Sequence, residues 1–283
     1  MMIGAELDLV AFGLLDSASW GISDFSGGLA ARRLSAVNVA AVAYLVGLAV
    51  ITGAALVSGE MPPPTGDFVR GALAGVVGAL GLSAFYHALA SGRMGLAAPV
   101  SAILVAAVPV IVGIAASGLP GTLQLVGFGL GAVALWLVSY TGAALLTLAD
   151  LRWPLLAGLG MGSFLAIIAQ TESGSVFWTL VAARATSVLT MFIILSRGMG
   201  SGWQGSRPVW MAAILAGVLD AAGNVFFMLA EQSGRLDAAA VLSSLYPAMT
   251  VLLAWLILKE RLTRTHIIGL VMAIAAAACI TVG

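Results

Sequence analysis

Long apolar stretches divide the chain into ten candidate membrane-spanning helices. A helix needs about 20 mostly apolar residues to cross a hydrocarbon core about 30 Å thick. Breaks at charged residues, prolines and glycine clusters leave stretches of that length along the whole chain. The predicted spans are 9–30, 36–57, 70–90, 95–117, 123–142, 154–172, 176–196, 209–231, 237–258 and 266–282. The pattern therefore predicts an all-α integral membrane protein with ten transmembrane helices.

The second half of the chain repeats the first at a fixed offset of 142 residues. Residues 73–76 (LAGV) recur as 215–218, and residues 91–93 (SGR) recur as 233–235. The same offset matches Gly81 with Gly223, Phe85 with Phe227, Ser101 with Ser243 and Gly127 with Gly269. A chain rich in Ala, Gly, Leu and Val also matches itself by chance, but a constant register over this length favours internal duplication.

Each half would contain five spans, which decides how the halves are related. An odd number of spans returns the second copy to the membrane upside down, so duplication gives an inverted repeat. We therefore expect two five-helix repeats, 1–142 and 143–283, that form one functional unit. Repeats of this kind enclose a site that opens to either side in turn, as in secondary transporters.

Small residues at helical spacing mark two of the predicted spans. The third span carries Gly71, Gly75, Gly78 and Gly81, and the fifth carries Gly127 and Gly131. Small residues at such spacing allow close helix approach in membranes. The alternative is that part of this set faces lipid and has no role in helix contacts.

Composition excludes an ordinary soluble protein. Hydrophobic residues make up 61% of the chain and charged residues 8%, against about 25% charged in soluble domains. The formal net charge is +0, which argues against nucleic acid as a partner. The single cysteine, Cys279, forms no disulfide framework or Cys/His metal spacing. We expect no cofactor and no metal, with the lipid bilayer as the surrounding partner.

Charged side chains at membrane depth need a reason, because each costs about 2.5–3.5 kcal/mol on insertion scales. Asp16, Arg184 and Asp220 lie deep in the first, seventh and eighth spans. On the eighth span, Asp220 shares a stripe with Asn224, Phe227 or Met228, and Glu231. This stripe is either the polar wall of a substrate site or, at Asp220, one half of a structural ion pair with Arg184.

The first span carries a second mixed stripe. Asp16, Trp20 and Asp24 recur every four residues, with Ser17 and Ser23 beside them. Such a stripe is expected to face the bundle interior, where the indole could stack on a flat substrate. Trp20 could instead anchor the helix at the membrane interface.

The remaining candidates lie on the third, fourth, sixth and ninth spans. Tyr86 is a substrate-binding candidate, and His87 is either a proton relay or a histidine satisfied at the membrane edge. The hydroxyl candidates are Ser101, Ser163, Ser243, Ser244 and Tyr246. Mid-span serines also bond to carbonyls of their own helix, so none of them indicates a site alone.

The last part of the chain resembles a known family of membrane proteins. Residues 226–280 contain an alanine-rich turn into SLYP at 244–247, a KERLT corner at 259–263, and Gly269 in the closing span. These features resemble the EamA-type repeat of the drug/metabolite transporter superfamily. The first half departs from the pattern, since Gly118 stands where the second half has Glu260. The resemblance implies a multi-pass protein of the bacterial inner membrane, similar to amino-acid exporters such as the YddG-like aromatic amino-acid exporters.

Motifs for enzyme chemistry are missing from the sequence. There is no H-E-x-x-H, G-x-S-x-G or G-x-x-x-x-G-K-[ST] pattern. Without a nucleotide-binding loop, an ion or substrate gradient would have to supply the energy. We therefore predict a secondary transporter of small amphipathic metabolites, most favourably amino acids, acting as a monomer or a homodimer. The alternatives are proton-coupled efflux of cationic drugs, and a passive channel or structural subunit.

Charge counts and family resemblance disagree about orientation. Connections on the side of the termini hold Arg70 and Arg235. The opposite side holds Arg32, Arg33, Arg93, Arg152, Arg197, Arg207, Lys259, Arg261 and Arg264. Positive loops tend to stay in the cytoplasm, so the count places the termini outside it. The resemblance implies cytoplasmic termini.

Overall fold

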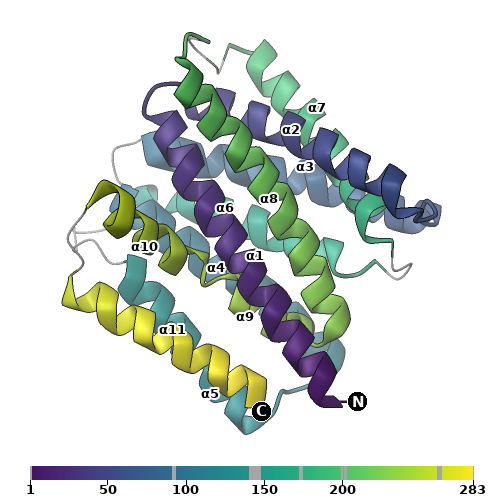
Figure 1. Ribbon diagram of the computed structural model, residues 1–283, viewed down its shortest axis with the longest axis vertical. Coiled ribbons are helices and arrows are strands. Elements are labelled where there is room, and N and C mark those ends of the chain that lie inside the picture. The colour runs from purple at the N-terminus through teal and green to yellow at the C-terminus, as the bar shows by residue number, and fades with distance from the viewer. Residues whose placement is uncertain are drawn as a thin grey trace.

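The chain folds as a bundle of helices (Figure 1). The computed structural model describes residues 2–90, 94–139, 148–171, 175–198, 200, 203–259 and 263–282. Its helices are α1 (Met2–Ala31), α2 (Ala36–Ser58), α3 (Thr65–Ala90), α4 (Met94–Ser117), α5 (Thr122–Ser139), α6 (Leu148–Ile168), α7 (Val176–Ser196), α8 (Arg207–Ser233), α9 (Leu236–Ser243), α10 (Tyr246–Leu258) and α11 (Arg264–Val282). Every regular element in these ranges is a helix, so the all-α fold is confirmed.

Ten predicted spans correspond to these eleven helices, because α9 and α10 together occupy the ninth span. Among the residues that the structure describes, six stretches are long and apolar enough to cross a membrane, by length and composition: 36–58, 65–85, 151–168, 176–196, 207–233 and 236–258. Several predicted boundaries were wrong by a few residues. The third helix begins at Thr65 rather than at residue 70, and the sixth ends at Ile168 rather than at 172. The predicted boundary between the halves, 142/143, lies outside the described residues.

The ninth span is the one element whose continuity was wrongly predicted. It breaks after Ser243, and the chain resumes as a helix at Tyr246. Pro247 stands at the second position of α10, where a proline needs no hydrogen-bond donor of its own. The Ala248 amide donates to the Leu245 carbonyl at 2.9 Å, which tightens the turn. The interruption therefore places non-helical backbone in the middle of a predicted membrane span.

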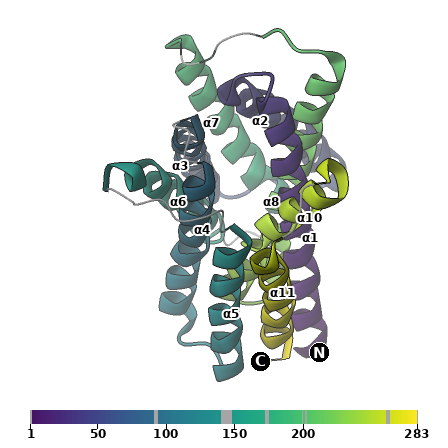
Figure 2. The ribbon, with the colours of Figure 1, turned by 90° about the vertical axis from the view of Figure 1, so that its left-hand side faces the viewer.

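Helices from the two halves interleave. Helix α1 packs along α8, and α3 packs along α6, at the centre of the bundle. Helix α11, the last helix of the chain, packs along α5, and both views show the two side by side (Figures 1 and 2). Helices α2 and α7 form a further pair on the other side of the bundle. Both termini lie at the same end of the molecule, which we call the terminus side.

The glycine stripes lie at helix contacts, as predicted. A Cβ atom at Gly71 would approach the Thr179 carbonyl oxygen to 2.6 Å, and one at Gly75 would collide with the Ala183 carbonyl. The same holds for Gly78 against Phe164, Gly81 against Gly160 and Met161, Gly127 against Ile280, and Gly131 against Val241. The interpretation that part of this set faces lipid is therefore wrong.

We predict that Gly75→Ala weakens the contact between α3 and α7. The new methyl group would collide with the α7 backbone, and overpacking of this kind costs about 1–3 kcal/mol. Thermal unfolding of the detergent-solubilised protein measures the effect. The matched control is Gly53→Ala on α2, where nothing lies within 4 Å of the new atom. Equal unfolding temperatures for the two variants would contradict the assigned contact.

Candidate functional site

The polar stripe of α1 meets the broken ninth span at the centre of the bundle. Two glycines of α1 make this approach close. A Cβ at Gly13 would lie 2.8 Å from Leu242, and one at Gly21 would lie 2.7 Å from the Tyr246 carbonyl oxygen. Thr250 on α10 donates to the Gly21 carbonyl at 3.1 Å. Side chains of α1 between the two glycines are thus held against the break.

Aromatic rings form one wall of this region. Trp20 stacks on Phe227 of α8 with centroids 6.3 Å apart and an interplanar angle of 19°. Tyr246, the first residue of α10, meets Trp20 edge-on at 6.2 Å and 88°. Both geometries are favourable arrangements of aromatic pairs. Trp20 and Tyr246 are therefore brought together, and Trp20 lies inside the bundle rather than anchoring α1 at the interface.

Three buried polar groups converge beside this wall without hydrogen-bond partners. Asp16 is 0% exposed. The Ser243 hydroxyl interacts with its carboxyl group, but within the described residues the two groups complete no hydrogen bond. The Trp20 indole N–H is also buried and unpartnered. Buried polar groups are normally satisfied, so one acid and two donors without partners mark this place as unusual.

Gly223 on α8 completes the same small region. A Cβ at this position would lie 2.6 Å from Trp20 Nε1 and 3.0 Å from the nearer Asp16 oxygen. The absent side chain therefore leaves space that the indole and the carboxyl group share. Sequence reasoning found Gly223 as a repeat match, but nothing in the sequence indicated its place between these two groups.

Arg184 and Asp220 are paired across α7 and α8. Arg184 Nη2 lies 2.5 Å from Asp220 Oδ2, and the arginine side chain is 4% exposed against 31% for the aspartate. The guanidinium also lies 5.1 Å from the centroid of the Tyr44 ring on α2. Asn224 donates to the Asp220 carbonyl at 2.6 Å. Tyr44 is a further residue of the site that sequence reasoning missed, because its pairing with Arg184 comes from the fold alone.

Solvent access increases along the α1 stripe. Asp16 and Ser17 are buried, Trp20 is partly buried, and Asp24 is exposed. Asp24 nevertheless interacts electrostatically with Asp220 and Tyr246, so it faces the other helices rather than lipid. The exposed carboxylate of the stripe therefore lies toward the end of α1 that is away from the termini.

The other predicted site residues lie apart or make structural bonds. Ser101 donates to the Pro154 carbonyl at 3.0 Å, and Ser244 donates to the Val241 carbonyl at 2.8 Å. Ser163 lies partly buried on α6. The side chains of Tyr86 and His87 lie outside the described residues, so their predicted roles stay predictions.

Hydrogen bonds of Arg235, Arg70 and Glu60, which we call the clamps, join the two halves on the terminus side. Arg235 donates to the Gly118 carbonyl at the end of α4 at 2.6 Å, while it also binds Asp237. Its hydrogen bond to Asp237 raises the pKa of the Arg235 guanidinium, so the charge is permanent. Arg70 donates to the Gln170 carbonyl at 3.0 Å. Glu60 accepts from the Phe177 amide at 2.9 Å, at the start of α7.

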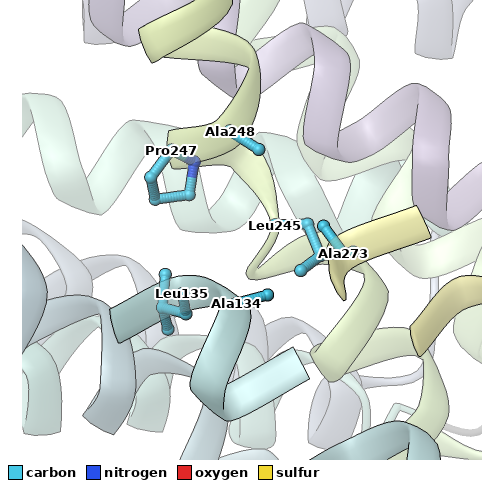
Figure 3. A pocket seen from close by; sticks show the side chains of 6 residues that line it. All are labelled: Ala134, Leu135, Leu245, Pro247, Ala248 and Ala273. Atoms are coloured by element: carbon cyan, nitrogen blue, oxygen red, sulfur yellow. The ribbon is translucent and has the colours of Figure 1, made fainter. Parts of the chain in front are cut away.

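A hollow on the side of the α9–α10 break that faces α5 and α11 has no polar side chain that could bind a polar substrate. It lies where α10 approaches α5 and α11, and only alanine, leucine and proline side chains line it (Figure 3). Within the described part of the chain, no group of three or more His, Cys, Asp or Glu residues could hold a metal ion.

We predict unequal costs for removing either partner of the Arg184–Asp220 pair. Asp220→Leu leaves a buried arginine unpaired and is expected to cost about 3 kcal/mol of unfolding free energy. Arg184→Leu leaves a half-exposed aspartate that water can reach, so the loss should be smaller. The double variant Arg184→Leu/Asp220→Leu should recover most of the stability. Denaturant unfolding checks this, and additive losses in the double variant would contradict the pairing.

Comparison with known proteins agrees with this architecture. Residues 151–282 match the EamA-like transporter family. A crystal structure of another protein matches 96% of this chain and 95% of its own, with a TM-score of 0.77 and 15% identity, which shows the fold alone. No curated protein sequence matches significantly. The second half of the chain, residues 151–282, is therefore similar to the EamA-like transporter family.

Proposed function

We propose that this protein is a secondary transporter of small amphipathic metabolites, with amino acids as the leading substrate class. The observation that carries the proposal is the mixed polar and aromatic site beside the break between α9 and α10. Interrupted helices at the membrane midplane commonly form the substrate sites of secondary transporters. The match of residues 151–282 to the EamA-like transporter family supports the same class. The family and the resemblance favour a bacterial inner membrane as its location.

Alternating access would arise from two inverted repeats, 1–142 and 143–283. The helix contacts support this relation because they come in matched pairs. Helix α1 packs on α8 and its counterpart α6 packs on α3, while α2 contacts α8 and its counterpart α7 contacts α3. In the described state Asp24 is exposed, and clamps join the helices on the terminus side. A carrier would alternate between this state and one in which the clamps separate.

The site fits a substrate with both a flat apolar part and a positive group. Trp20, Phe227 and Tyr246 offer ring faces and edges. Asp24, whose side chain is exposed, would attract an ammonium group. Asn224 and Asp220 lie on the neighbouring α8. Ser163 and Tyr86 remain proposed contacts of the substrate. Ser101 and Ser244 already donate to backbone carbonyls, so their contribution would be weaker.

A second candidate function is efflux of cationic drugs in exchange for protons. It is favoured by the charges of the site: Asp16 and Asp24 both interact with Asp220, and Arg184 is the one cation paired with Asp220 among the described residues. A site with excess carboxylates attracts cations, and aromatic rings add cation–π attraction. A zwitterionic amino acid and an organic cation share the ammonium group, so competition experiments separate the two classes.

We predict that Trp20→Ala and Tyr246→Ala weaken substrate binding at least about tenfold, which corresponds to about 1.4 kcal/mol of lost ring contact. The measurement is uptake into proteoliposomes, with unlabelled amino acids, sugars and organic cations as competitors. Trp255→Ala is the matched control, because that tryptophan is 45% exposed on α10. Uptake that does not saturate and shows no counterflow would indicate a channel and contradict the proposal.

We predict that loss of a clamp exposes the terminus side. A single cysteine at Leu9, buried at 4% and facing Gly234, is introduced together with Cys279→Ser. Arg235→Ala in this background should increase its labelling by a water-soluble maleimide several-fold, because α9 is no longer held to α4. Arg264→Ala, an exposed arginine on the other side, is the control. Unchanged labelling in Arg235→Ala would show that this contact does not hold the closed side.

A further inference from the structure

The polar stripe of α1 has no counterpart in the other half. At the 142-residue offset, Asp16, Trp20 and Asp24 correspond to Gly158, Gly162 and Ala166 on α6. A Cβ at Gly158 would lie 2.6 Å from the Ser101 carbonyl oxygen, and one at Gly162 would lie 2.8 Å from the Leu104 carbonyl oxygen. The same position in the bundle is thus filled by close, dry helix contact on α6. The acidic stripe on α1 is not needed for the fold, which indicates a function.

The buried carboxyl group of Asp16 is the centre of this difference. An ionised carboxylate without partners in a dry interior costs several kcal/mol. Asp16 is 0% exposed, and neither of its oxygens completes a hydrogen bond among the described residues, so its surroundings favour the neutral form of the carboxyl group. Two unused donors, the Ser243 hydroxyl and the Trp20 indole N–H, stand in the same region. Donors of this kind stabilise a carboxylate once the proton has left.

We propose that Asp16, Ser243 and Trp20 form a proton-binding site, at which Asp16 binds the proton and the two donors hold its ionised form. The site exchanges one proton with water that enters from the Asp24 end of the stripe. The carboxylic O–H bond breaks, and the proton passes to a water molecule. The role of this site in transport rests on the proposed function; its ability to bind a proton does not.

Charged groups near Asp16 are few. Asp220 on α8 interacts with it electrostatically, and this charge is compensated by Arg184 on α7, which also faces Tyr44 on α2. Asp24, two turns further along α1, interacts with Asp220, and Tyr246 on α10 interacts with Asp24.

The other titratable groups on neighbouring helices are placed differently. Asp237 on α9 is bound to Arg235, and Glu231 stands near the terminus-side end of α8. On α11, Cys279 is partly buried against Gly127 of α5, and His266 lies in the first turn, at the opposite end from the termini. No cation other than Arg184 lies near Asp16 among the described residues, so a proton is the simplest compensation for its charge.

Trp20 connects this site to the substrate region. Its ring contacts Phe227 and Tyr246, while its N–H faces the space beside Asp16. An ionised Asp16 would attract a substrate ammonium group, whereas a protonated one would not. Substrate and proton would therefore exclude one another, which is the requirement for exchange between them.

Infrared difference spectroscopy of the full-length protein in lipid tests proton binding without any substrate. A protonated buried carboxyl group gives a carbonyl stretching band that disappears when the group ionises. We expect a band that disappears as the pH is raised and is absent from Asp16→Asn. The band should remain in Asp8→Asn, which removes an exposed aspartate of the same helix. A band that persists in Asp16→Asn, or the absence of any titrating band, would overturn the proposal.

Two donor variants keep the test informative even where Asp16→Asn does not fold. Ser243→Ala and Trp20→Phe each remove one donor with little change of shape, so the band should disappear at a higher pH than in the unchanged protein. An unchanged midpoint in both would refute their role. Repeating the titration in sodium chloride and choline chloride separates proton from sodium binding. A band that sodium alone removes at constant pH would identify a sodium site and overturn the proton proposal.

Transport measurements then separate this inference from the proposed function. Proteoliposomes with an imposed pH gradient should accumulate the substrate found by competition, and Asp16→Asn should retain counterflow but lose accumulation. If no amino acid or cation is transported while the Asp16 band titrates, the proposed function fails and the proton site stands. If transport is found but is independent of pH and of Asp16, the exchange role fails.

Discussion

The structure depends on one constraint: a polar group inside a membrane protein must find its partner within the protein, because hydrocarbon offers none. Most polar side chains of this bundle obey it. Thr186 donates to the Ala72 carbonyl and Ser187 to the Gly75 carbonyl, which joins α7 to α3. Ser23 donates to the Ala216 carbonyl and joins α1 to α8. Arg184 and Asp220 neutralise one another. Against this background, the unpartnered groups around Asp16 stand apart.

Close helix contact makes those groups possible. Glycine contacts bring α3 close to α6 and α7, and hydrogen bonds from Thr186 and Ser187 add to the contact with α7. At the corresponding position, α1 carries an acid and an indole where α6 carries glycines. In the proposed function, α6 therefore supplies close helix contact and α1 supplies the polar and aromatic groups. The break between α9 and α10 adds backbone and the Tyr246 ring to the same place.

The sequence predicted the fold well because the relevant signals are local. Apolar stretches of membrane length gave ten spans, and glycine spacing located helix contacts that the structure contains. It predicted the break in the ninth span poorly, since Pro247 is compatible with the start of a helix as well as with an interruption. The partner of Arg184 could be proposed from charge compensation. Tyr44 and Gly223 could not be found, because their places beside Arg184 and Asp16 depend on how α2 and α8 pack.

The proposed transport requires that a site between α1 and the broken ninth span opens to one side at a time. Distances measured by electron–electron double resonance across both ends test it most directly. Spin labels at Leu119 and Gln232 report the terminus side, and labels at Arg33 and Lys259 report the opposite side; all four residues are exposed. We expect two populations in which one distance lengthens as the other shortens when substrate or pH changes. Distances that stay fixed, or that lengthen together, would contradict it.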